Sequence, residues 1–333
     1  MFQQSLPDLA EYRRELAAAG APVPLPGVPA GSDGLLPQLP APSAGRRGWP
    51  WDVQTRPLAT TLQDWPRITI VTPSFQQGDF LEETIRSVLL QNYPQLEFVV
   101  MDGSSADASP AIIDRYRPWL SYARSAPDHG QAHAINLGFS LAGGDVRGWL
   151  NSDDFLLPGT LRRVAQAWRR GADFIYGDAI DLDQATRRRR YTFANLAYPR
   201  YRKFSGLFPQ PSAFWAGSCA RSLWEAQQCA IDYELWIRLL PGRRIRYINW
   251  PLAVARQHEA AKTYDPAMKQ RWEEDAVRNG LAHPELYRPN PWLDREYRLV
   301  QRITRCWRRL GGGRRCRALQ RECAWSEAIT LSP

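Results

Sequence analysis

Acidic side chains follow two segments that are typical of buried strands. Asp102 comes directly after the apolar run 96–101, with Asp107 five residues further on, and Asp153 and Asp154 follow the run 146–150. In an open parallel sheet, ligands bind outside the carboxyl ends of the strands, so we expect these carboxylates to gather at one edge. Four like charges are costly together unless a cation or a hydrogen-bonding ligand lies between them. Because adjacent aspartates can hold Mg²⁺ or Mn²⁺, which often bridge to a diphosphate, the pattern predicts a metal-assisted nucleotide-diphosphate site.

The segment after the first predicted strand excludes other kinds of phosphate site. It reads Pro-Ser-Phe-Gln-Gln-Gly over 73–78. Dinucleotide binding requires G-x-G-x-x-G at this place, and a P-loop requires G-x-x-x-x-G-K-[ST]. A sugar-phosphate nucleotidyltransferase would share the α/β layout but expects a Gly-rich, basic loop here, so that class is disfavoured.

The alternation of elements predicts the framework that must position these residues. Apolar runs at 68–72, 96–101, 146–150 and 172–176 are typical of buried parallel strands. Helical patterns at 79–91, 109–116, 133–142 and 158–168 alternate with them, and a helix at 232–240 and a strand at 244–250 come later. The alternation predicts an α/β fold, a doubly wound, Rossmann-like domain with a mostly parallel sheet flanked by helices.

The composition bounds the class of protein. The chain has 333 residues, 44% of them hydrophobic, which is enough for one sizeable core. No apolar run approaches the ~18 residues of a membrane helix, and the N-terminus lacks the layout of a secretory signal. Five cysteines, none in a C-x-x-C pair, are interpreted as reduced thiols of a cytoplasmic protein. The formal charge of +9 suggests an acidic partner such as phosphate, a nucleotide or an anionic membrane.

Three regions are expected along the chain. Residues 1–66 contain eleven prolines and form a Pro/Gly-rich N-terminal extension, expected to run extended over the surface or to be partly disordered, with a short helix at 9–19. Residues 67–265 form the α/β domain. Residues 266–333 form a basic helical C-terminal region.

The basic region leaves two interpretations open. Leu299, Ile303, Trp307 and Leu310 recur at helical spacing, and the segment 302–321 contains eight arginines and no acid. The region is either a solvated helix pair packed on the domain or a surface in peripheral contact with an anionic membrane, at its cytoplasmic face. No nucleic-acid partner is expected, because no stacking aromatics alternate with the arginines.

Over roughly Ile68–Thr263 the sequence resembles the family-two inverting glycosyltransferases, which have the GT-A fold. The resemblance is carried by TIVTPSFQQGDFLEETIRSVLLQNYPQLEFVVMDGSSAD, APDHGQAHAINLGFSLAGGDVRGWLNSDDFLLPGTL, PQPSAFW, DYELWIRL and ARQHEAAKT, in this order. It implies metal-assisted transfer of a sugar, with inversion, from a nucleotide-diphosphate sugar to a hydroxyl acceptor. A hexose as the sugar, and a saccharide or lipid-linked glycan of polysaccharide biosynthesis as the acceptor, would fit.

The resemblance assigns residues to the donor-nucleotide pocket. Thr72, Pro73 and Ser74 match the edge of the first strand, where backbone groups flank the base. Asp102 matches the acid that hydrogen-bonds the base or the ribose. Asp128 matches a further acid of the donor pocket, and its alternative role is to cap a helix.

The resemblance also assigns the metal shell. Asp153 matches the residue near the ribose, and Asp154 matches the ligand of the divalent cation, Mn²⁺ or Mg²⁺. His258 matches a histidine that in some members completes the metal shell or touches the diphosphate. The alternative for His258 is an ordinary surface position in a loop.

Asp232 matches the catalytic base of the family. A sugar hydroxyl is a poor nucleophile, and a carboxylate at hydrogen-bond distance removes its proton as the new bond forms. The alternative is that Asp232 only caps the helix that it opens. Glu234 would point elsewhere, and Gln210 and Trp215 are candidates for the sugar pocket, with a core position as the alternative for Trp215.

One departure from the family bears on activity. Relatives place a longer, Gly-containing loop before the base, whereas residues 225–231 form a short segment without glycine. A second class of function therefore stays open: a catalytically impaired protein that binds nucleotide sugars or serves as a membrane-associated scaffold.

Overall fold

The structure is a computed structural model of the chain. It describes residues 33–43, 45–58, 65–141, 143–195, 199–201, 203–204, 208–262, 265–309, 312–325 and 331–332. The helix predicted at 9–19 lies outside these residues, and so does Leu310.

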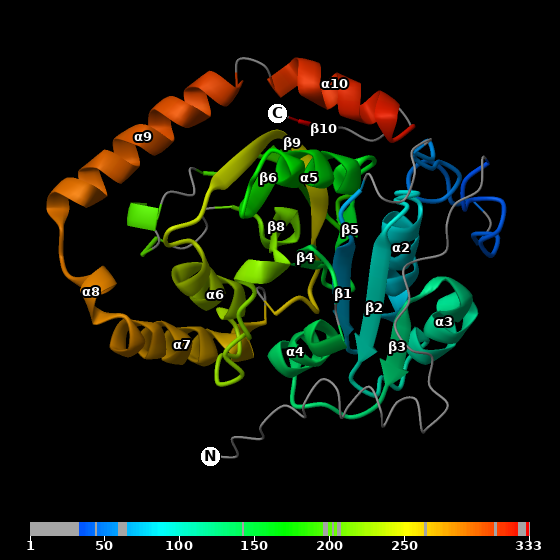
Figure 1. Cartoon of the computed structure of the whole chain (residues 1–333), viewed down its shortest axis with the longest axis horizontal. Helices are drawn as coiled ribbons and strands as arrows, with labels where there is room; N and C mark the ends of the chain where they lie inside the picture. Colours follow the sequence, from blue (N-terminus) through cyan, green and yellow to red (C-terminus); the bar gives the residue numbers. More distant parts are fainter. Residues whose placement is uncertain are drawn as a thin grey trace.

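A sheet of ten strands forms the centre of the described chain (Figure 1). Its strands are β1 (Ile68–Ser74), β2 (Leu96–Asp102), β3 (Tyr122–Ser125), β4 (Val146–Trp149), β5 (Phe155–Leu156), β6 (Phe174–Asp183), β7 (Arg189–Thr192), β8 (Ala213–Ala216), β9 (Ile245–Gln257) and β10 (Leu331–Ser332). The order is β10-β7-β6-β8-β4-β1-β2-β3, and β9 pairs with β5 and β6. The β3-β2-β1-β4 half is parallel, and β8 runs antiparallel to both of its neighbours. The predicted α/β fold with a mostly parallel sheet is confirmed.

Helices cover both faces of this sheet. One face packs against α2 (Gly78–Leu89), α3 (Ser109–Tyr116) and α5 (Thr160–Arg169), and the other packs against α4 (Gln131–Leu141) and α6 (Ile231–Leu239). Neighbouring strand residues alternate between the two cores: Ile70 belongs to the first and Val71 to the second. Short 3₁₀ turns complete the described domain at Arg117–Trp119, Pro199–Tyr201, Gln210–Ser212, Gly217–Cys219 and Pro266–Met268.

The parallel register brings several strand ends to one edge. Ser74 at the end of β1 is paired with Asp102, and Asp102 is paired with Ser125 at the end of β3. β9 continues well past the strand predicted at 244–250 and ends at Gln257, next to His258. The long β9 thereby carries His258 to the loop that follows β4, because Arg256 in β9 hydrogen-bonds Asp154.

The described part of the N-terminal extension differs from its prediction. Residues 33–58 contain no helix or strand, but Leu35, Leu39, Trp49 and Trp51 are buried. Arg86 of α2 is also buried and donates hydrogen bonds to the carbonyls of residues 40, 50 and 51. This segment is therefore packed into the domain and does not merely run over its surface. No periodic apolar pattern marked it, because an irregular segment buries side chains without a fixed spacing.

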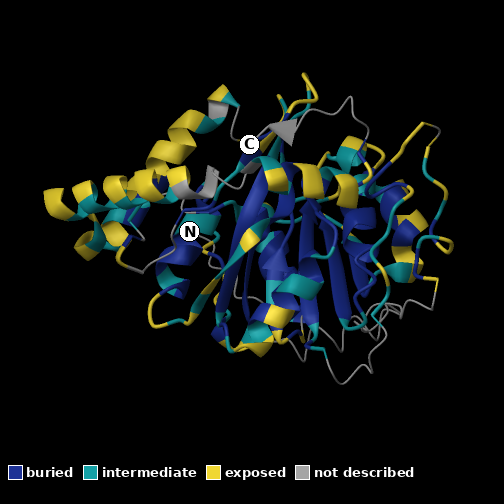
Figure 2. Ribbon diagram, turned by 90° about the horizontal axis from the view of Figure 1, so that it is seen from above, coloured by how far each residue is buried: buried dark blue, intermediate teal, exposed yellow. Residues whose placement is uncertain are grey.

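The C-terminal region is helical, as predicted, and its helices are α7 (Lys269–Ala282), α8 (Pro284–Tyr287), α9 (Pro291–Arg309) and α10 (Gly312–Glu322). α10 packs on the first core through Cys316 and Leu319. α7 and α9 form an arm along one side of the domain, largely exposed in Figure 2. Among the described residues, no helix combines the length and apolar character that a membrane span needs.

Candidate active site

Asp102 is held rigidly at the carboxyl edge of the sheet. Its side chain is buried, and its Oδ2 accepts hydrogen bonds from the Ser105 backbone N–H (2.9 Å) and from the Ser125 hydroxyl (2.6 Å). The Ser105 hydroxyl donates to the other oxygen, Oδ1, at 2.6 Å. A carboxylate oriented by three donors is well suited to accept a further hydrogen bond from a ligand.

Two predicted residues of the same edge carry unsatisfied hydroxyl groups. The Oγ1 of Thr72 and the Oγ of Ser74 are buried and have no hydrogen-bond partner within the described part of the chain. Buried polar groups normally find a partner, so these two hydroxyls are available to hydrogen-bond a polar ligand. They lie on β1 next to β2, which ends at Asp102.

Phe75 and Asp128 border the same place. A Cβ atom built on Gly103 would lie 3.1 Å from the Asp128 Oδ2 and 3.3 Å from a ring carbon of Phe75, so both side chains flank the Asp102 loop. Phe75 is 62% exposed. An exposed ring beside a polar pocket is suited to stacking on a nucleobase. Sequence reasoning missed Phe75, although its position directly after β1 is a usable signal.

Asp107 does not belong to this group of acids. Its carboxylate accepts hydrogen bonds from the backbone N–H groups of Gly78 (2.7 Å) and Ser109 (2.9 Å), at the starts of α2 and α3. It thus lies beside the segment that follows β1, but both of its oxygens serve as helix-start acceptors.

Asp153 and His258 face each other. The Asp153 Oδ2 lies 3.1 Å from the His258 Nε2, and the two side chains are 19% and 7% exposed. The Phe80 ring packs on the His258 ring at 4.6 Å between centroids, which holds the imidazole in place. An oxygen and a nitrogen donor side by side fit the ligand chemistry of Mn²⁺, while Mg²⁺ prefers oxygen donors. In the described residues there is no group of three or more such side chains that would enclose a metal ion by itself.

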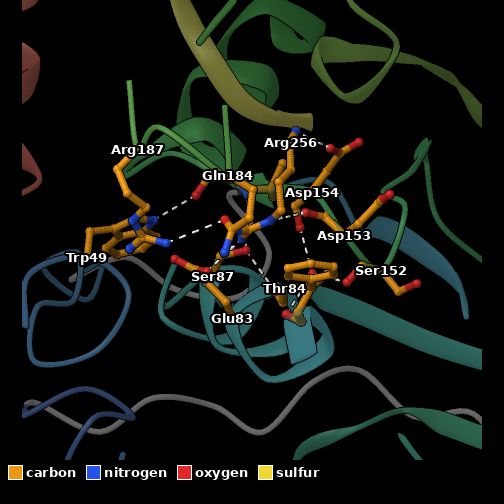
Figure 3. Close-up of polar contacts among 12 residues, drawn as sticks. Trp49, Glu83, Thr84, Ser87, Ser152, Asp153, Asp154, Gln184, Arg187 and Arg256 are labelled. Carbon is orange, nitrogen blue, oxygen red and sulfur yellow. Dashed lines mark hydrogen bonds and ion pairs between the residues drawn. The ribbon is translucent and has the colours of Figure 1, made fainter. Parts of the chain in front are cut away.

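Asp154 lies in different surroundings from its neighbour (Figure 3). It is buried, and its Oδ1 accepts a hydrogen bond of 2.9 Å from the Arg256 backbone N–H. Its own carbonyl accepts from the Thr84 hydroxyl at 2.6 Å. Burial and the neighbouring Asp153 carboxylate raise the pKa of Asp154 well above its usual range. The structure thus pairs His258 with Asp153, whereas the sequence prediction grouped His258 with Asp154.

Arg256 fastens the loop that carries both aspartates. Its Nε donates to the Asp153 carbonyl (2.7 Å), and its two terminal nitrogens donate to the Gln184 Oε1 (2.8 Å) and the Glu83 Oε2 (2.6 Å) (Figure 3). The guanidinium also lies 4.7 Å from the centre of the Phe80 ring. Each of its three nitrogens donates a hydrogen bond within the protein and the side chain is only 2% exposed, so Arg256 fastens the loop and does not face solvent.

Asp232 sits in the first turn of α6, half-buried. Burial raises the pKa of its carboxyl group, and hydrogen bonds from the backbone N–H groups of Asp232 and Tyr233 act in the opposite direction. A carboxylate with a raised pKa is a stronger base than an ordinary aspartate. Its rival Glu234 is fully engaged with Arg238 of the same helix, whose Nη2 donates to the Glu234 Oε2 at 2.6 Å.

A buried carboxylate of α7 holds the short segment that precedes Asp232. The Oδ2 of Asp275 accepts hydrogen bonds from three consecutive backbone N–H groups, those of Gln228 (2.9 Å), Cys229 (2.7 Å) and Ala230 (3.1 Å). Asp275 is completely buried, and Arg278 donates to its other oxygen. Sequence reasoning missed this clamp, which fixes the segment that lacks the longer loop of the relatives.

Amide side chains connect the β4 loop to the neighbouring elements. The Gln131 Nε2 donates to the Asn151 Oδ1 (2.9 Å), and the Asn151 Nδ2 lies 3.4 Å from the Gln210 Oε1. Gln210 therefore contacts the β4 loop, and its place in the sugar pocket stays a prediction. Trp215 does not, since it is 1% exposed and packs against Trp149 in the second core.

The chain is similar to known glycosyltransferases. The family described as Glycosyl transferase family 2 matches residues 69–221. A protein of Mycobacterium tuberculosis (strain H37Rv), described as an uncharacterized glycosyltransferase, is 35% identical over 104 residues, which are 31% of this chain and 40% of that protein. The GalNAc(5)-diNAcBac-PP-undecaprenol beta-1,3-glucosyltransferase of Campylobacter jejuni is 26% identical over 122 residues, 34% of this chain and 38% of the relative. The solved structure of S. aureus TarS with UDP-GlcNAc is 14% identical, with a TM-score of 0.49, over 66% of this chain and 71% of that one.

These similarities cover only part of this chain and part of each relative. The chain spans about two fifths of the length of the curated relatives that match it first. The matched region, 69–221, contains β1 to β8 and the loops that carry Asp102, Asp128 and Asp153, while Asp232, His258 and Asp275 follow it. The mostly parallel sheet with helices on both faces is the GT-A arrangement predicted from the sequence. Residues 69–221, which make up most of this domain, are thus similar to glycosyl transferase family 2.

Proposed function

We propose that this protein is an inverting glycosyltransferase that moves a sugar, a hexose, from a nucleotide-diphosphate sugar to a hydroxyl of a saccharide or lipid-linked glycan. The observation that carries the proposal is one edge of the sheet where unsatisfied hydroxyls, an oriented acid and an Asp–His pair lie together. The hydroxyls of Thr72 and Ser74 and the carboxylate of Asp102 suit a nucleoside. The pair Asp153–His258 suits a metal-bound diphosphate.

The donor would be held by groups that are already oriented. Asp102 would accept a hydrogen bond from the base or ribose, Phe75 would stack on the base, and Asp128 would border the ribose. Backbone groups of residues 72–74 would flank the base. Because Ser105 and Ser125 fix the Asp102 carboxylate beforehand, little side-chain freedom is lost when the nucleotide binds.

Asp153 and His258 would hold the divalent cation, Mn²⁺ or Mg²⁺. When bound, the cation would neutralise charge on the leaving diphosphate. We favour Asp153 over Asp154 as the carboxylate ligand because the Asp154 carboxylate is buried and hydrogen-bonded to the backbone of Arg256. In this proposal, Asp154 keeps the loop in the conformation that presents Asp153.

Asp232 would take the proton of the acceptor hydroxyl. The hydroxyl oxygen forms its bond to the anomeric carbon while the bond from that carbon to the diphosphate breaks, and the proton passes to the Asp232 carboxylate. Attack from the face opposite the nucleotide inverts the configuration. Burial of Asp232, which raises its pKa, supports this role, and the occupation of Glu234 by Arg238 removes the nearest alternative.

We further propose that α9 rests on the surface of an anionic membrane. Its exposed apolar residues Trp292, Leu299 and Ile303 share one face of the helix, and Arg295 and Arg302 flank them. A basic amphipathic helix of this kind binds lipid headgroups and inserts its apolar side chains between them. This would bring the active site to a lipid-linked acceptor.

The test is a screen of UDP-, GDP- and TDP-sugars for donor hydrolysis with and without Mn²⁺. Wild-type protein is expected to release the nucleoside diphosphate from at least one donor in a metal-dependent way, and Asp232→Asn is expected to lose transfer. Binding of nucleoside diphosphates without turnover of any donor would instead favour a catalytically impaired nucleotide-sugar-binding scaffold. Absence of both binding and turnover would contradict the proposal.

A further inference from the structure

Lys262 reaches across the gap between the donor side and the base side of the candidate site. It follows β9, four residues beyond His258. Its Nζ lies 3.0 Å from the Oε1 of Gln131, at the start of α4, and 3.4 Å from the carbonyl oxygen of Gln228. Gln228 belongs to the segment that Asp275 clamps before Asp232.

The ammonium of Lys262 rests only on neutral oxygens. In the described parts of the chain, no carboxylate lies within ion-pair distance of it. Neighbouring atoms partly desolvate the ammonium and lower the pKa of Lys262; Arg271 acts in the same direction, and Cys229, Asp128 and Asp153 act in the opposite one. The side chain as a whole is exposed, so the ammonium is accessible to an anionic ligand and need not leave an ion pair to bind it.

The position of Lys262 indicates which anion would compensate it. Asp128 borders the proposed nucleoside pocket, Asp153 belongs to the proposed metal pair, and Gln228 leads to the proposed base. In the proposed function the diphosphate would lie between these three groups, with its β-phosphate, which carries the sugar, on the side of Asp232. Arg256 is less suited to this anion, since each of its nitrogens already donates to Glu83, Gln184 or the Asp153 carbonyl and its side chain is only 2% exposed.

Resting on the proposed function, we propose that Lys262 binds the β-phosphate of the nucleotide-sugar donor through its ammonium group. In the free protein the ammonium is kept in place by Gln131 and Gln228. When the bond from the sugar to the β-phosphate breaks, negative charge grows on that phosphate, and a preorganised cation stabilises it. Lys262 would therefore contribute both to donor affinity and to departure of the leaving group.

The experiment compares wild type, Lys262→Met, Lys262→Arg and the control Lys269→Met by titration calorimetry. Lys269 is an exposed lysine at the start of α7, outside the site. Each protein is titrated with UDP, GDP, UMP and GMP in the presence of Mn²⁺. A charged hydrogen bond is worth enough to expect about a tenfold to hundredfold loss of diphosphate affinity in Lys262→Met.

The expected pattern is specific. Lys262→Met loses affinity for the diphosphate that wild type binds but keeps its affinity for the matching monophosphate, whereas Lys262→Arg and Lys269→Met behave like wild type towards both. Equal diphosphate affinity in Lys262→Met, or an equal loss for monophosphate and diphosphate, would overturn the role of Lys262 while leaving the proposed function intact. If wild type binds neither diphosphate, the proposed function fails, and the inference fails with it. Melting temperatures of the four proteins verify that each variant is folded.

Discussion

Asp153 and Asp154 are adjacent in the sequence but lie in different surroundings. Asp153 is partly exposed beside His258, and Asp154 is buried with its carboxylate on the Arg256 backbone. We expect Asp153→Asn to weaken Mn²⁺-dependent binding of UDP or GDP by about tenfold or more, because a metal ligand is lost. Asp154→Asn keeps an acceptor for the Arg256 N–H and is expected to retain most of the metal-dependent affinity. Calorimetry with and without Mn²⁺ measures both effects.

If Asp154→Asn weakens Mn²⁺-dependent nucleotide binding more than Asp153→Asn does, Asp154 is the metal ligand, as the sequence resemblance implies. Asp154→Ala provides a further measurement, since alanine leaves the buried Arg256 N–H without its acceptor. We expect this variant to be destabilised by about 1–3 kcal/mol in urea unfolding. Asp153→Ala removes the partner of a single ring nitrogen, the His258 Nε2, at a position that is itself 19% exposed and can admit water, so its stability should change less.

The pKa of Asp232 leads to a second prediction. A base acts in its ionised form, so a pKa raised by burial moves the acidic limb of the rate–pH profile above the range of an ordinary aspartate. We expect Asp232→Asn to lower kcat by about 10²- to 10⁴-fold, which a transfer assay with saturating donor would measure. A profile that is flat down to the usual aspartate range would argue against Asp232 as the base.

The same pKa predicts the sign of a stability effect. A carboxyl group whose pKa is higher in the folded than in the unfolded protein lowers the free energy of unfolding once the pH exceeds its unfolded pKa. The full loss is reached when the pH exceeds its folded pKa. Asp232→Asn removes the buried charge, so the variant should melt at the same temperature as wild type or higher at pH 7. This advantage should disappear as the pH falls below the pKa of an unfolded aspartate, about 3.9, because the carboxyl is then protonated in both states.

Much of the candidate site could be predicted because its acids follow strand ends. Asp102, Asp128 and Asp153 border one edge of the sheet, where the resemblance expected a nucleotide donor to bind. Lys262 and Arg256 were not predicted. A sequence does not reveal whether a lysine or arginine side chain is paired within the protein or free to bind a ligand, since that depends on contacts between elements far apart in the chain.

At the scale of elements, α7 positions the helix that carries the candidate base. Asp275→Ala would leave three consecutive backbone N–H groups and Arg278 without their buried acceptor. We expect a loss of about 3–5 kcal/mol in the free energy of unfolding. We also expect a lower kcat in the protein that remains folded, because the segment before Asp232 loosens. Urea unfolding and steady-state transfer kinetics measure the two effects.

Glu274→Ala is the matched control, since Glu274 is exposed on the same helix and contacts only Gln270 among the described hydrogen bonds. Asp275→Asn keeps one acceptor oxygen and should fall between wild type and alanine. Diphosphate affinity should fall less than kcat in the folded variants, because the contact of Lys262 with Gln131 is kept when the contact with Gln228 loosens. A clamp variant with unchanged kcat would show that α7 only stabilises the fold.

How clearly each element could be predicted from the sequence depended on how it is buried. Strands β1 and β2 are buried on both faces, so their apolar runs were plain in the sequence. The two-residue strand β5 is too short to leave a pattern, and the end of β9 is polar because Arg256 and Gln257 lead into the site. The segment 33–58 escaped prediction for a different reason: it buries its tryptophans from irregular backbone.

At the scale of the whole molecule, segments from both ends of the described chain meet on the same core. The Trp49 N–H donates to the Cys323 carbonyl (2.8 Å), and the Trp49 indole donates to the Leu156 carbonyl (2.7 Å). Cys316, Leu319 and Trp325 are buried in the first core as well. Deleting everything after residue 290 would therefore open that core, so truncation cannot separate a membrane role of the C-terminal helices from a folding role.

Point substitutions on the outer face of α9 separate the two roles. Leu293 and Tyr297 face the second core, while Trp292, Leu299 and Ile303 are 78%, 58% and 60% exposed. Replacing the three exposed residues by serine should leave the melting temperature unchanged and lower the partition onto phosphatidylglycerol vesicles by about hundredfold. The reason is that each apolar side chain that enters the bilayer interface contributes roughly 1 kcal/mol. Vesicle co-sedimentation measures the partition.

The control replaces Val277 and Leu281 by serine, two residues of α7 that are similarly exposed but have Glu273 and Glu274 on their helix, one turn from Val277 and two turns from Leu281. These changes should leave vesicle binding intact, because anionic lipid repels an acidic neighbourhood. Binding of wild type should also fall as salt is raised, since the α9 arginines attract the lipid across water. If the α9 triple variant sediments with vesicles as wild type does, α9 is only a solvated helix. The enzyme would then meet its acceptor away from the bilayer surface or through another face.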